Sequence, residues 1–154
     1  MELTGYTFDC ESNNLYLKAS KIWYIRFLSL DNSRSLKVFP FREGKEKSRA
    51  KIMEWVESFP DDSCVLSWNG LGFDVWLLWK FLDIKPRVGK GGKDYLENKP
   101  VQFIDGYVLS MYLNPNSPKH SLEYLSGGED EDGKIDYRKS LIEAGAMQAN
   151  DPKG

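Results

Sequence analysis

Hydrophobic side chains in the first forty residues come in short runs with polar residues between them, a pattern typical of β-strands. Residues 3–9 alternate loosely, and residues 22–30 are rich in aromatic and β-branched side chains. A turn at residues 31–33 then leads to a third run at residues 35–39. We therefore expect three strands in an antiparallel meander.

The pattern changes after Pro40. Apolar residues recur at helical spacing among charged ones over residues 50–59, which predicts an amphipathic helix. Residues 64–68 then predict a buried strand, and residues 73–82 predict a helix that is apolar on nearly all sides. A further strand is expected at residues 101–104, followed by a short helix at 107–113.

The remaining segments carry weaker signals. Residues 85–99 are charged and rich in glycine, so we expect a surface excursion there. A short helix is expected near 122–125, an acidic loop at 127–133, a last amphipathic turn or two at 136–146, and a polar tail at 147–154.

This order of elements predicts an α/β fold. An antiparallel meander followed by alternating helices and parallel strands gives a mixed sheet with helices on both faces. The first strand is expected to be central, with ligands near the strand ends where the strand order switches. We expect a single domain over residues 1–154.

Composition narrows the function. The 154 residues are 41% hydrophobic, enough for one packed core, and the net charge is −2. A weakly acidic domain cannot hold long nucleic acid by phosphate neutralisation alone, so such a role would be local and would use metal ions. We expect no membrane segment and no signal peptide, and two cysteines favour a reducing compartment.

Asp9 and Glu11 are the first candidate chemical group. Residues two apart on a strand point to the same face, so these two carboxylates stand side by side. Like charges repel unless a cation lies between them, and hard divalent cations prefer oxygen ligands. Exposed acids are common at strand ends, so the pair alone is also consistent with a solvated surface.

Asp74 is the third candidate acid. It falls in the first turn of the apolar helix, where the helix dipole favours a negative charge, so helix capping is one explanation. The expected strand order also brings it towards Asp9 and Glu11. Three carboxylates around one point would suit two Mg²⁺ or Mn²⁺ ions, an arrangement used in phosphodiester hydrolysis.

Three blocks of sequence carry a resemblance to a known family. They are YTFDCESNNLYLKASKIWYIRF, VLSWNGLGFDVWLLWKF and FIDGYVLSMYLNPNSPKHSLEYL, and they cover most of residues 6–125. In this order they resemble the first and second exonuclease motifs, and the stretch that follows them, in the 3′-to-5′ proofreading domain of family A DNA polymerases, especially those of short-tailed phages. This domain belongs to the DEDD superfamily.

The resemblance implies a ribonuclease H-like fold and removal of nucleotides from a DNA 3′ end. It makes Asp9 the carboxylate shared by two metal ions, Glu11 a ligand of the first, and Asp74 a ligand of the second. The implied partners are single-stranded DNA or a primer 3′ end, in the cytoplasm of a bacterial host infected by a phage.

Five further residues receive roles from the resemblance. Leu15, Asn69 and Phe73 match positions that contact DNA, although leucine and phenylalanine also suit a core and asparagine a helix entry. Asp105 is expected to support the metal ligands or cap a helix, with Gly106 at the family's threonine position weakening that cap. His120 is expected to pack and hydrogen-bond rather than to catalyse.

The family's third motif, which supplies a fourth carboxylate, has no match. Tyr137 is followed four residues later by Leu141 rather than by aspartate. We expect a C-terminally incomplete domain of weak or no activity, completed by a missing segment or by a polymerase polypeptide. Two alternatives stay open: substitution by another acid (Glu123, Asp130 or Asp136), or an inactive module that binds DNA or a replication protein.

Two surfaces complete the sequence picture. Trp76 and Trp79 lie three apart on the apolar helix, which indicates a partner surface or a covering helix. Basic residues that are candidates for DNA contact are Lys18, Lys21, Arg42, Lys45, Lys47, Arg49, Lys51, Lys85, Arg87, Lys90 and Lys93.

Overall fold

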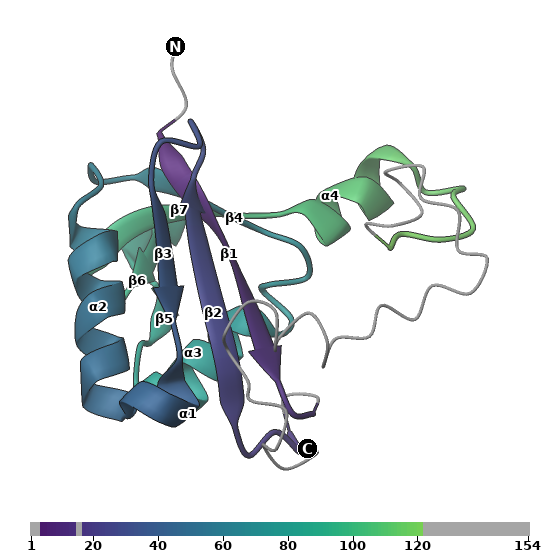
Figure 1. Cartoon of the computed structure of the whole chain (residues 1–154). Coiled ribbons are helices and arrows are strands. Elements are labelled where there is room, and N and C mark those ends of the chain that lie inside the picture. The colour runs from purple at the N-terminus through teal and green to yellow at the C-terminus, as the bar shows by residue number, and fades with distance from the viewer. Residues whose placement is uncertain (1–3, 15–16, 122–154) are drawn as a thin grey trace.

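The sheet is the frame on which the candidate acids are mounted. The computed structural model describes residues 4–14 and 17–121. In this part of the chain seven strands form one mixed sheet in the order β3-β2-β1-β4-β7-β6-β5, with β1 near its centre (Figure 1). The strands are β1 (Gly5–Ser12), β2 (Ile22–Ser29), β3 (Ser35–Val38), β4 (Ser63–Ser67), β5 (Pro86–Val88), β6 (Asp94–Leu96) and β7 (Lys99–Asp105).

Strand directions follow the predicted switch from antiparallel to parallel. β1 pairs antiparallel with β2, and β2 pairs antiparallel with β3. On its other side β1 pairs parallel with β4, which in turn pairs parallel with β7. The carboxyl ends of β1, β4 and β7 therefore point the same way, so loops that follow these strands gather at one end of the sheet.

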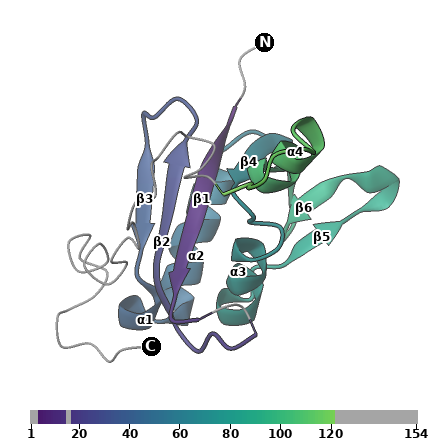
Figure 2. The same cartoon turned by 90° about the vertical axis from the view of Figure 1, so that its right-hand side faces the viewer.

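The helices cover both sides of the sheet. They are α1 (Pro40–Glu43), α2 (Lys45–Glu57), α3 (Asp74–Leu82) and α4 (Gly106–Leu113), with a 3₁₀ turn η1 (Lys90–Gly92). α2 packs against α3, and Figures 1 and 2 show the sheet between α2 and α4. This arrangement confirms the predicted α/β class and its mixed sheet. None of the described helices is long and apolar enough to cross a membrane.

The core determines which way the acids face. Tyr6, Phe8 and Cys10 on β1 are buried in the hydrophobic core beneath α2 and α3. Because side chains alternate along a strand, Asp9 and Glu11 point to the opposite face of the sheet. The sequence pattern of β1 therefore places two carboxylates together on one face.

The structure differs from the sequence prediction at several boundaries. Residues 85–99, expected as a surface excursion, form the hairpin of β5 and β6, which extends the sheet beyond β7. These strands are three residues each, too short for a recognisable alternation. α1 was not predicted. α2 begins at Lys45, before the predicted residue 50, and the apolar pattern missed its first turns because they are charged and mostly exposed.

Several predictions fall outside the described residues. They concern Leu15, the helix near residues 122–125, the acidic loop at 127–133, the amphipathic turns at 136–146 and the tail at 147–154.

Gly5→Ala is expected to destabilise the fold by about 3 kcal/mol or more. A β-carbon at Gly5 would lie 2.0 Å from the carbonyl oxygen of Cys64 on the neighbouring strand, at a φ of +155°. Gly44→Ala is the matched control, because Gly44 also has a positive φ but nothing lies within 4 Å of an added β-carbon. Urea unfolding of both variants measures the difference, and equal losses would contradict the steric explanation.

Candidate active site

One hydrogen bond joins the start of α3 to the end of β1. β1 pairs with β4 only as far as Thr7, so the backbone of β1 beyond that point has no strand on its β4 side. There the backbone nitrogen of Cys10 donates to Oδ1 of Asp74 at 2.9 Å. Asp74 is buried, and the N-terminus of α3 has no side-chain cap, so this carboxylate serves the strand rather than its own helix.

Three carboxylates surround the Cys10 position. Burial raises the pKa of the Cys10 thiol well above its usual range, and the negative charges of Asp74, Asp9 and Glu11 raise it further. The structure therefore brings Asp9 and Glu11 of β1 and Asp74 of α3, the three acids predicted from the sequence, to the same end of the sheet.

Asp9 is the middle acid of the three. Burial raises the pKa of Glu11 to about 7, and the charge of Asp9 adds to that shift. Burial also raises the pKa of Asp74 to about 7, again with a contribution from Asp9. Partial desolvation raises the pKa of Asp9 itself, although its side chain reaches solvent. Asp9 thus interacts with both neighbours.

The charge of this group is not balanced by cations of the described part of the chain. Arg26 lies opposite Asp9 in the β1–β2 register, yet the ion pairs between described residues do not include Asp9, Glu11 or Asp74. Buried like charges of this kind favour binding of a cation. The donors are carboxylate oxygens, which hard ions such as Mg²⁺ and Mn²⁺ prefer.

The carboxylates do not form a closed metal cage. Within residues 4–14 and 17–121, no group of three or more His, Cys, Asp or Glu side chains is close enough together to hold one ion. The charge interactions instead link Asp9 with Glu11 and Asp9 with Asp74. Mg²⁺ often takes only one or two carboxylates and completes its shell with water and substrate phosphate oxygens, so this donor set fits such an ion.

Asp105 holds the loop that leads to Asp74. Its buried carboxylate accepts hydrogen bonds from the backbone nitrogens of Asn69 at 2.9 Å and Leu71 at 3.0 Å. It also accepts from the backbone nitrogen of Tyr107 at 3.0 Å and so caps α4. One side chain therefore fixes both the entry to α3 and the start of α4.

The ring of Trp68 leaves no room for a side chain at Gly106, which follows Asp105. A β-carbon there would lie 2.6 Å from Cε3 of the Trp68 ring. A threonine at this position would collide with that ring, and the cap of α4 is made by Asp105 without it.

The other predicted site residues within the described chain lie in the loop before α3 and beside α4. Asn69 is exposed, with a left-handed φ of 57°, and supplies no side-chain cap to α3. Phe73 is half-buried against the core. His120 lies beside α4, where its Nδ1 is 3.0 Å from Oγ of Ser110.

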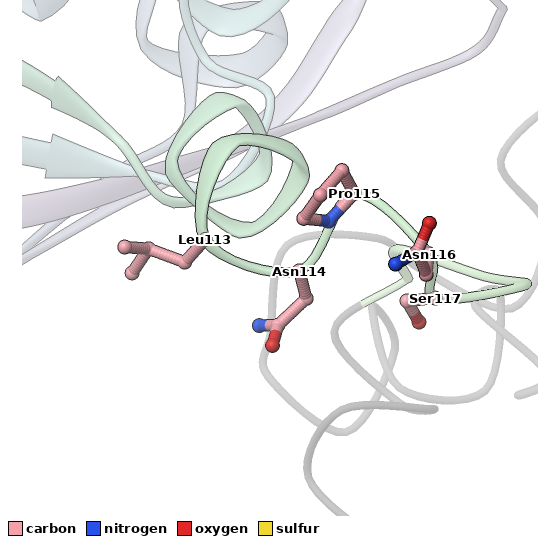
Figure 3. Close-up of a pocket in the computed structure, with 5 residues that line it drawn as sticks. All are labelled: Leu113, Asn114, Pro115, Asn116 and Ser117. Atoms are coloured by element: carbon pink, nitrogen blue, oxygen red, sulfur yellow. The ribbon is translucent and has the colours of Figure 1, made fainter.

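A surface depression of about 400 Å³ lies at the end of α4 (Figure 3). It is lined by Leu113, Asn114, Pro115, Asn116 and Ser117. None of these five side chains titrates or supplies a carboxylate, so the depression offers neither acid–base groups nor hard metal ligands. The carboxylate group at β1 and α3 is the better candidate for chemistry.

Sequence reasoning missed two structural roles near the acids. It did not identify the Cys10 backbone as a partner of Asp74, or Asp105 as the anchor of the loop after β4. Ser67 at the end of β4 lies opposite Asp105 at the end of β7. The sequence predicts where β4 and β7 end, but the pairing of Ser67 with Asp105 is known only from the strand register.

Comparison with known proteins shows the fold. No family model and no curated protein matches the sequence. A solved structure of exonuclease I, described in terms of its processivity, has a TM-score of 0.58 and 12% identity, and the match covers 83% of this chain and 36% of that chain. The zinc-bound form of E. coli exonuclease I with single-stranded DNA has a TM-score of 0.59 and 12% identity, covering 87% of this chain and 36% of that chain.

The chain thus spans little more than a third of the length of these exonuclease structures. At this identity the likeness confirms the ribonuclease H-like exonuclease fold that the sequence resemblance implied.

The metal-free protein is expected to lose stability as the pH rises. Folding raises the pKa of Glu11 from 4.5 and of Asp74 from 3.8, in both cases to about 7. Between these pKa values the folded chain therefore binds more protons than the unfolded chain. The protonated acids contribute their full stabilisation of the fold below the unfolded pKa values, and this contribution is lost as the pH rises past 7.

Thermal unfolding in EDTA, followed across this pH range, tests the expectation. The double variant Glu11→Gln/Asp74→Asn is the control, because its amides do not titrate and the new asparagine side chain retains an oxygen for the Cys10 backbone. The variant should give the flatter pH profile. A wild-type profile equally flat would contradict the raised pKa values of Glu11 and Asp74.

Asp105→Ala is expected to lower the free energy of unfolding by about 3 kcal/mol, because it leaves three backbone donors without their acceptor. Asp105→Asn retains one acceptor oxygen and should lose less. Urea unfolding ranks the two variants, and an alanine variant as stable as wild type would show that water replaces the carboxylate.

Proposed function

We propose that this chain is the nuclease domain of a 3′-to-5′ exonuclease that hydrolyses the terminal phosphodiester of DNA. The observation that carries the proposal is that Asp9 and Glu11 share one face at the end of β1 while the backbone of Cys10 between them donates to Asp74, and that the ion pairs between described residues include none of these acids. The exonuclease fold and the sequence resemblance support the same reaction.

In the proposed site Asp9, Glu11 and Asp74 would hold two divalent ions, with Asp9 as the carboxylate common to both. When bound, Mg²⁺ or Mn²⁺ ions supply an activated water and stabilise the leaving oxygen. The chain's own contribution is positional. The Cys10 backbone fixes one oxygen of Asp74, and Asp105 fixes the loop from Asn69 to Leu71 that precedes it.

The proposal includes a proofreading role with a phage-type family A DNA polymerase in the host cytoplasm. The three sequence blocks support this context, and the substrate would be a primer 3′ end or single-stranded DNA. Since the sequence contains no Tyr-x-x-x-Asp motif at the expected place, the fourth carboxylate would come from a further segment or from a second polypeptide.

The lack of that motif also favours a second candidate, a binding module without hydrolysis. Such a protein would keep the fold and its acids but dock DNA ends or a replication protein. The two candidates differ in one measurable respect: only the nuclease needs Asp9 and Glu11 for turnover.

Asp9→Ala/Glu11→Ala is expected to abolish Mn²⁺ binding at this site and to lower nuclease activity at least about a hundredfold, because the charge that holds the ions is removed. Titration calorimetry with Mn²⁺ reads the first effect. Digestion of 5′-labelled single-stranded DNA reads the second, with products shortened one nucleotide at a time from the 3′ end.

Glu54→Ala is the control, because Glu54 is an exposed acid on α2. It should leave both readouts unchanged. The isolated chain is expected to be weakly active at best, with activity restored by a polypeptide that carries the missing motif. Nuclease activity that survives the double replacement would place the reaction elsewhere, and Mn²⁺ binding without turnover even in the presence of that polypeptide would favour the binding module.

A further inference from the structure

α3 turns an aromatic face towards solvent. The helix buries Asp74, Val75, Leu77, Leu78 and Leu82. Trp76 and Trp79 lie on its other side, where Trp79 is 39% exposed and Trp76 is partly buried. Adjacent aromatic rings at a surface can serve as a stacking platform for a ligand.

Trp76 is held in place and supports Trp79. Its Nε1 donates to the backbone oxygen of Leu71 at 2.6 Å, within the loop that Asp105 anchors. The two indole rings lie 5.5 Å apart between centroids, tilted by 41°. Trp79 therefore presents its ring from a fixed base, so little side-chain entropy remains to be lost on binding.

The surroundings of Trp79 are basic. Nζ of Lys85 lies 6.0 Å from the centre of the Trp79 ring. Lys80, on the same side of α3, donates to the backbone oxygen of Ala19 at 2.7 Å, which brings the segment after β1 against the helix. The nearby acid Asp83 is engaged in an ion pair with Lys45. Lys85 thus lies over the ring, Lys80 follows Trp79 on the helix, and the adjacent acid is paired.

We infer that Trp76, Trp79, Lys80 and Lys85, the α3 face, form a binding site for single-stranded nucleic acid. A base stacks on Trp79, and the lysines contact phosphates of the same strand. Stacking on tryptophan bordered by basic side chains is the usual chemistry of sequence-tolerant single-strand binding. An apolar protein partner would not need the two lysines.

The position of this face deepens the proposed function and rests on it for the direction of the strand. Trp79 is five residues after Asp74, about 7 Å along the helix axis and about 140° around it, so its ring lies across α3 from the buried Asp74 carboxylate. A strand whose 3′ end lies at the carboxylates would have to pass around α3 to place an upstream base on Trp79.

Trp79→Ala is expected to weaken binding of a fluorescein-labelled oligothymidylate of about twelve nucleotides between about 5-fold and 100-fold, the range for loss of one stacked base. Fluorescence anisotropy in EDTA measures the Kd without hydrolysis. Trp79→Phe should recover much of the affinity. Lys85→Glu should weaken binding and reduce its salt dependence.

Two controls match these variants. Tyr112→Ala removes an aromatic ring that is 82% exposed on α4, and Lys119→Glu reverses an exposed charge in the segment after α4. Both should bind as wild type. An oligouridylate of the same length shows whether the site accepts RNA as well as DNA, since stacking on Trp79 serves either.

Unchanged affinity in both Trp79→Ala and Lys85→Glu, or no binding by the wild-type chain, would overturn the inference, as would an equal loss in the controls. The outcome is separable from the proposed hydrolysis. A chain that binds through Trp79 but releases no nucleotides with Mg²⁺ or Mn²⁺, even beside a polypeptide that carries the missing motif, supports the α3 face and contradicts the nuclease. If the Trp79→Ala chain digests and binds DNA as well as wild type, the result supports the nuclease and contradicts the α3 face.

Discussion

The candidate site depends on the hydrogen bond from the Cys10 backbone to Asp74. β1 is longer than the stretch that β4 covers, so its last residues extend past their parallel neighbour. A buried backbone donor at that point needs an acceptor, and the first turn of α3 supplies a carboxylate. The same contact that completes the sheet therefore brings a third acid to Asp9 and Glu11.

This arrangement satisfies a buried backbone donor, and it also places carboxylates that repel one another close together. Satisfying the Cys10 donor requires a carboxylate near two others, and desolvation makes their repulsion stronger. A divalent cation relieves that repulsion without disturbing the hydrogen bond, because Asp74 uses only Oδ1 for Cys10. The packing of one strand end thus explains why Asp74 lies at the end of β1 that carries Asp9 and Glu11.

The sequence indicated the acids better than their surroundings. The period of two in β1 put Asp9 and Glu11 on one face, and the apolar run after Asp74 located its helix, because both patterns are local. Asp105 was identified as a capping or supporting residue, but its hold on the Asn69–Leu71 backbone depends on the β4–β7 register, which involves residues 36 apart. The β5–β6 hairpin was missed because strands of three residues carry almost no period.

The exposure of Trp79 could be predicted only in part from the apolar pattern of α3. Helical spacing placed Trp76 and Trp79 on one side of α3 but did not say which side faces the core. The burial of Leu77 and Leu78 determines that, and the bond from Trp76 to the Leu71 backbone ties the exposed face to the loop preceding Asp74. Asp105 anchors that same loop. Asp74 and the aromatic face are therefore positioned by one short segment, so they are held in a fixed relation to each other.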